Sequence, residues 1–217
     1  MKTLQLQRKR DEAWHYVGPR SDLKEPLVLI FGNRFLLEEA ATFEEIRKLF
    51  PDGHLVFGSS SGDLIADSVN DEHLSVTAIE FERALFEVKT INISTVAYNS
   101  ELAGREVVSK LNPNGLKHIF VVSEGSSVNG SALTKGMQAA APKVLITGGL
   151  CGDDARFERT LAGYNKPPDD GEIVVIGFYG ESFEASFSLY GGWIPFGPQR
   201  VVTRSEGNVL YEIDGKP

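Results

Sequence analysis

A serine stands at the centre of a G-x-S-x-G sequence at residues 58–62. This residue, Ser60, occupies the position of the nucleophile in hydrolases that carry a nucleophile elbow. The motif follows a predicted strand, as an elbow does, but residues 63–71 have the composition of a loop where an elbow needs a helix. Two interpretations stay open: a small-molecule hydrolase that uses Ser60, and a glycine- and serine-rich turn at the end of a strand.

The only cysteine, Cys151, lies among glycines and is a second candidate nucleophile. It would need a nearby base or backbone amides to activate the thiol, and a buried, inert cysteine is the alternative. A single cysteine excludes an intrachain disulfide and a cysteine-rich zinc site. The histidines lack the spacing of metal ligands; they are His15, His54, His73 and His118. We therefore expect no metal and no cofactor.

A loop rich in glycine and hydroxyl groups, residues 125–131, separates a predicted strand from a predicted helix. It lacks the lysine of a phosphate-binding P-loop. Its backbone amides and the start of the following helix nevertheless suit a carboxylate, and Ser126, Ser127 and Asn129 add neutral donors and acceptors. The structural alternative is that Ser131 caps the helix.

Two predicted strands end in similar glycine-rich turns, at residues 58–63 and 148–154. Glycine lets a ligand approach the backbone closely. Close by in sequence, Arg156 carries a planar guanidinium that suits a carboxylate, and Asp153 or Asp154 could accept an ammonium group. Together they would form the pair of opposite charges that an α-amino acid requires. The alternative is that Arg156 and Asp154 only pair with each other on the surface.

A stretch of glycines, prolines and aromatic residues spans residues 190–198 and includes Trp193 and Phe196. This composition predicts a non-repetitive loop with a large apolar area, which could roof a pocket or serve a protein-interaction scaffold. The expected ligand-binding residues are Ser59, Ser60, Ser126, Ser127, Asn129, Gly148, Gly149, Asp153, Arg156 and Trp193.

The order of predicted elements repeats along the chain. Strands are expected at residues 27–31, 54–57, 73–81, 86–93, 119–122, 144–147, 173–178, 183–190, 201–204 and 208–213, and helices at 42–50, 100–111 and 131–141. The turns at 58–63 and 148–154 align at an offset of about 90 residues. We therefore predict an α+β domain with mixed sheets, built from two pseudo-repeated strand–helix–strand–strand–strand halves that share a ligand cleft.

The domain boundaries follow from this repeat. Residues 1–26 are expected to form an N-terminal arm, and residues 27–217 one domain. Its pseudo-repeats cover about residues 27–97 and 117–193, and a C-terminal strand segment follows them.

The composition is that of an ordinary globular protein, with 217 residues, 41% hydrophobic and 24% charged. The net charge of −8 argues against nucleic-acid binding as the main role. No apolar run approaches the roughly 20 residues of a membrane helix, and no signal peptide is recognisable. We therefore expect a cytoplasmic protein with no membrane partner.

Several stretches resemble the FIST N-terminal domain, named for F-box and intracellular signal-transduction proteins. They are residues 148–153 with Arg156, Phe157 and Thr160, then residues 191–198 and 202–217. The resemblance implies a sensory input domain for small ligands such as amino acids, with no catalytic residues to carry over. It also implies a C-terminal FIST domain or another output module as partner, which this sequence lacks, so homo-oligomers could cover the exposed surface. Relatives often have a cysteine-containing stretch where this chain has Ser59–Ser61.

Overall fold

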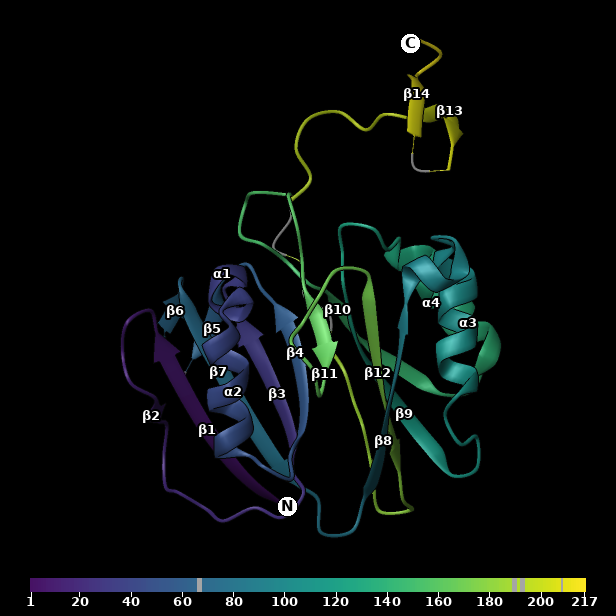
Figure 1. The fold of residues 1–217 in the computed structure, drawn as a ribbon. Helices are drawn as coiled ribbons and strands as arrows, with labels where there is room; N and C mark the ends of the chain where they lie inside the picture. The colour runs from purple at the N-terminus through teal and green to yellow at the C-terminus, as the bar shows by residue number, and fades with distance from the viewer. Residues whose placement is uncertain (66–67, 189–190, 192–193, 208) are drawn as a thin grey trace. The chain divides into compact units, whose positions relative to one another are not determined.

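We describe a computed structural model of the chain, covering residues 1–65, 68–188, 191, 194–207 and 209–217. It divides into two compact units, an N-terminal unit, Met1–Ala185, and a C-terminal unit, Ser186–Pro217. Figure 1 shows the elements of both units. Among the described residues, no helix is both long and apolar enough to cross a membrane.

The first sheet of the N-terminal unit has six strands in the order β11-β4-β3-β7-β1-β2. Their bounds are β1 Lys2–Lys9, β2 His15–Tyr16, β3 Leu27–Gly32, β4 His54–Ser59, β7 His73–Glu80 and β11 Ala162–Tyr164. β3 and β4 run parallel, and helices α1 (Arg34–Glu38) and α2 (Ala40–Leu49) connect them. A small hairpin, β5 (Asp63–Ile65) and β6 (Ser68–Asn70), follows β4.

The second sheet has four strands in the order β10-β9-β12-β8. Their bounds are β8 Leu85–Asn92, β9 Leu116–Ser123, β10 Leu145–Leu150 and β12 Glu172–Tyr179. A 3₁₀ helix (Ile93–Val96) and helix α3 (Ser100–Ser109) lead from β8 to β9, and helix α4 (Gly130–Ala140) joins the parallel pair β9 and β10. The C-terminal unit contains one antiparallel hairpin, β13 (Val202–Glu206) and β14 (Val209–Ile213).

The two sheets share one pairing pattern, which is the repeat expected from the sequence. β4-β3-β7-β1 in the first sheet corresponds to β10-β9-β12-β8 in the second, with one parallel pair and two antiparallel pairs in each. The repeat seen in the pairing is displaced by one strand from the expected boundaries. Residues 1–26 contain β1, which pairs with β7, and residues 86–92 pair with the second sheet.

Three apolar clusters place the core in layers. One lies between the first sheet and α1 and α2, one between the second sheet and α3 and α4, and the third between the two sheets. Both faces of β12 are therefore buried: Ile173 and Val175 belong to the cluster with the helices, whereas Val174 and Ile176 belong to the cluster between the sheets. A continuous apolar run is what such a strand requires.

Two local expectations are wrong. Residues 183–188 form no strand, and β12 pairs with β8 and β9 instead; residues 189 and 190 lie outside the described part of the chain. Helix α2 begins at Ala40, two residues before the expected N-cap, Thr42. The buried Thr42 hydroxyl instead accepts a hydrogen bond from Arg8 (2.7 Å), so tertiary contact determines its role.

Candidate functional site

The turns that follow β4 and β10 are in direct contact. The Gly152 amide donates a hydrogen bond to the Ser59 carbonyl (2.9 Å), and the Ser61 hydroxyl donates to the Asp154 carbonyl (3.1 Å). A Cβ at residue 152 would overlap with the Ser61 side chain, so glycine permits this approach. The repeat in the sequence predicts that these two turns occupy related places.

A cavity of about 290 Å³ lies beside these turns, and we call it the inter-sheet cleft. Its lining consists of Phe31, Ser59, Ser60, Ser61, Phe120, Val121, Val122, Gly149, Leu150, Cys151 and Gly152. The cleft is at the carboxyl ends of both parallel strand pairs, the edge where open α/β sheets bind ligands. Most of its lining is apolar, so it suits a ligand with an apolar body.

The geometry around Ser60 differs from that of a hydrolase. Its hydroxyl donates to the Asp63 carboxylate (3.0 Å), and within the described part of the chain no histidine hydrogen-bonds to it. Burial raises the pKa of Asp63, and the bond from Ser60 only partly opposes this shift. The chain continues from Gly62 into β5 and not into a helix. Ser59 is buried and accepts the Leu161 amide (2.9 Å), so its hydroxyl ties β4 to the segment before β11.

Cys151 lines the inter-sheet cleft with a protonated thiol. Burial raises its pKa to about 12, and the contact with the Ser59 backbone only partly opposes that rise. A nucleophilic cysteine needs the opposite shift, because the thiolate is the reactive form. Cys151 is therefore an inert cysteine at neutral pH.

The loop at residues 125–131 does hold a carboxylate, but that carboxylate belongs to the chain. Glu124 is buried and accepts the backbone amides of Ser126 and Ser127, the latter at 2.9 Å. It also accepts the hydroxyl of Thr160 (2.7 Å). The one signal for this contact in the sequence is an acidic residue directly before an amide-rich loop.

The remaining residues of this loop have structural contacts. Asn129 is the N-cap of α4, because its side chain accepts the Ala132 amide (2.9 Å), and Ser131 is already inside the helix. Glycine at residue 125 lets the loop pack against the Cys151 carbonyl. The loop therefore lies next to the second turn, as expected, without lining the inter-sheet cleft.

Two neighbouring glycines of β10 have different surroundings. Gly148 has φ +129°, and a Cβ there would overlap with the Val121 backbone. Gly149 faces open space and lines the inter-sheet cleft. Only the second of these glycines therefore leaves room for a ligand.

Asp153 holds the loop that follows the second turn. Its buried carboxylate accepts three backbone amides, from Phe157 (3.0 Å), Glu158 (2.7 Å) and Arg159 (2.9 Å). Burial by itself would raise the pKa of Asp153, but these three bonds outweigh it and lower the pKa. Asp153 is thus an organiser of the loop, which leaves Asp154 as the other carboxylate of this turn.

Arg156 follows the second turn and is not among the residues that line the inter-sheet cleft. Its Nε is 3.8 Å from an Asp154 carboxylate oxygen, and its guanidinium is 4.9 Å from the centre of the Phe35 ring. The same carboxylate accepts a hydrogen bond from the Asn33 side chain (3.3 Å). The pairing that the sequence left open as an alternative is therefore present. Trp193 lies outside the described residues.

Residues 26–216 match the FIST N domain, nearly the whole sequence, and the chain belongs to this family. FIST N is a sensory domain of signal transduction, and its members are generally non-catalytic. No curated protein matches the sequence. Among the residues that the structure describes, no group of three or more metal-ligating side chains is assembled.

Proposed function

We propose that the inter-sheet cleft is the sensory site and that it binds a free α-amino acid with an apolar side chain. The observation that supports this most is the meeting of the two turns, because an apolar cavity lies beside them and Asp154, which pairs with Arg156, contacts the cleft residue Ser61. Such a combination of an apolar lining with a few polar groups is typical of small-molecule sites.

Each part of the ligand has a matching group. The Arg156 guanidinium takes the α-carboxylate in a two-pronged contact, and the Asp154 carboxylate takes the ammonium group. The apolar side chain enters between Phe31 and Phe120, next to the open space at Gly149. The ligand would exchange one exposed ion pair for two charge-assisted contacts. Because exposed pairs contribute only about 0–1 kcal/mol, their loss costs little.

The test is thermal unfolding with L-leucine and two analogues of the same shape. 4-Methylpentanoate lacks the ammonium group, and leucine amide lacks the carboxylate. At 100 times its dissociation constant, leucine is expected to add about 2.7 kcal/mol to the free energy of unfolding, and both analogues are expected to add far less.

Arg156→Ala should abolish the shift caused by leucine and leave the melting temperature without leucine nearly unchanged. The matched control is Arg105→Ala, which removes a comparably exposed arginine on α3 that pairs with Glu101 (3.8 Å). A shift that persists in Arg156→Ala, or that 4-methylpentanoate reproduces in full, would contradict the proposed site.

A second candidate function, protein docking, is favoured by the C-terminal unit. Its described residues expose several large apolar side chains: Phe187, Ile194, Phe196, Val201, Val202, Val209, Leu210 and Tyr211. An isolated two-stranded hairpin is marginally stable in water, so this unit is expected to bind another surface. FIST domains usually pair with other domains. Light scattering tests one form of this idea: a strict monomer at high concentration would contradict self-association.

A further inference from the structure

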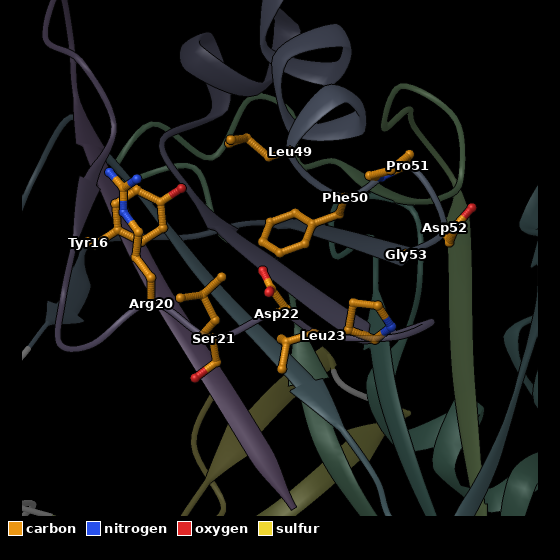
Figure 2. Close-up of a pocket in the computed structure, with 12 residues that line it drawn as sticks. Tyr16, Arg20, Ser21, Asp22, Leu23, Leu49, Phe50, Pro51, Asp52 and Gly53 are labelled. Carbon is orange, nitrogen blue, oxygen red and sulfur yellow. The ribbon is translucent and has the colours of Figure 1, made fainter.

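A second cavity lies at the opposite end of β3 and β4 from the inter-sheet cleft. Its lining includes Pro26 and Gly53, the residues directly before these two strands, together with residues of the segment 16–26. Figure 2 shows it, and we call it the basal cavity. Its volume is about 330 Å³, within the range of small-molecule sites. A six-residue strand is about 20 Å long, so the two cavities are separate.

The floor of the basal cavity is apolar and held in place. Phe50 and Leu4 are buried residues that line it. The turn after α2 is fixed by Arg47, whose guanidinium donates to the carbonyls of Phe50 (3.2 Å) and Gly53 (2.8 Å). A floor that is already ordered costs little to arrange when a ligand binds.

One wall carries opposite charges that do not pair with each other. The Arg20 guanidinium lies over the Tyr16 ring, 3.9 Å from its centre. In Figure 2 the Asp22 carboxylate points toward Phe50, whereas the Asp52 carboxylate points away from it. Within the described part of the chain, Asp22 has no hydrogen-bond or ion-pair partner.

We propose that the basal cavity binds a small organic amine with an aliphatic or aromatic body. The ammonium group pairs with the Asp22 carboxylate, and the apolar body lies on Phe50. The face of an aromatic ring attracts cations, which adds to the pairing. The charged residues of the lining are Arg20, Asp22 and Asp52, so the cavity carries a net charge of −1, which favours a cation. A metal ion is a poorer match, because it needs several oxygen ligands and only one carboxylate points inward.

The experiment is calorimetric titration of the full chain with phenethylamine. 2-Phenylethanol is the neutral analogue of the same shape, and phenylacetate is the anionic one. Phenethylamine is expected to bind at least ten times more tightly than 2-phenylethanol, and phenylacetate is expected not to bind. Equal affinities of the amine and the alcohol would overturn the proposal, because the carboxylate would then contribute nothing.

Asp22→Asn should lower the affinity for phenethylamine at least tenfold. Asp52→Asn is the matched control, since it removes the same charge from the same cavity without removing the inward contact, and its effect should stay below threefold. Equal losses in both variants would show a general charge effect and contradict the proposal. Arg156→Ala should leave phenethylamine binding intact, which separates this result from the fate of the proposed leucine site.

Discussion

The amide of Gly152 and the carbonyl of Ser59 are joined by a hydrogen bond of 2.9 Å that connects the ends of β10 and β4. β4 and β10 hold equivalent positions in the two halves. The bond therefore joins two matching strands, one from each half, beside the inter-sheet cleft. The geometry of the cleft thus depends on both sheets at once. A change that shifts one sheet against the other is expected to alter ligand binding before it unfolds the chain.

Two adjacent glycines are expected to respond very differently to substitution. Gly148→Ala should lower the free energy of unfolding by at least about 2 kcal/mol, because its Cβ would overlap with the Val121 backbone and its φ is +129°. Gly149→Ala should stay within about 0.5 kcal/mol, because nothing lies near its Cβ. Denaturant titration of the two variants measures both values, and a similar loss in each would contradict the described backbone of β10.

The buried carboxylate of Glu124 is expected to be a major support of the loop at residues 125–131. Glu124→Gln should cost about 1.5–3 kcal/mol, because an amide oxygen cannot satisfy every donor that the carboxylate serves. Glu106→Gln on the exposed surface of α3 is the control, with an expected change within about 0.5 kcal/mol. Urea unfolding that gives equal values for both variants would show that Glu124 is dispensable.

Cys151 is expected to resist thiol reagents in the folded chain. With a pKa of about 12, roughly one thiol in 10,000 is ionised at pH 8, whereas an ordinary thiol is about one quarter ionised. Labelling with a disulfide reagent should therefore be at least 100 times slower in buffer than in denaturant. Comparable rates under the two conditions would place the thiol in a much more polar environment than the inter-sheet cleft.

Stability should fall on mild acidification because of His118. Burial lowers the pKa of His118, so the unfolded chain takes up a proton before the folded chain does. The contribution of neutral His118 to the free energy of unfolding is complete above about pH 6.5. It is lost as the pH falls toward the pKa of His118 in the folded chain. His118→Gln should reduce the loss of stability between pH 7.5 and 5.5, measured by chemical unfolding.

Patterns that depend on both faces of a strand could be predicted from the sequence, and contacts between distant segments could not. The apolar run at residues 173–178 predicted a strand, and β12 forms there with both faces buried. The similarity of the two glycine turns predicted that they occupy related places. The strand β1 was missed because Leu4 and Leu6 alternate with polar residues over a short stretch, which is typical of many exposed segments as well.

The candidate site was predicted in part for a similar reason. Glycine and serine at strand ends indicated the inter-sheet cleft, because their roles are local. The roles of Asp153 and Glu124 depend on backbone amides that fold back onto them. Residue type alone cannot distinguish a carboxylate that is free to bind a ligand from one that hydrogen-bonds to the backbone of its own loop.

The short strand β11 makes the two halves interdependent. It comes from the second half of the chain, between β10 and β12, yet it pairs with β4 of the first sheet. Each half has its own apolar cluster against its helices, but the first sheet is completed only by residues made much later in synthesis. A chain cut between β7 and β8 should therefore give two fragments that recover the native structure together and not separately. The repeat is a pair of halves that share one strand, and not two independent modules.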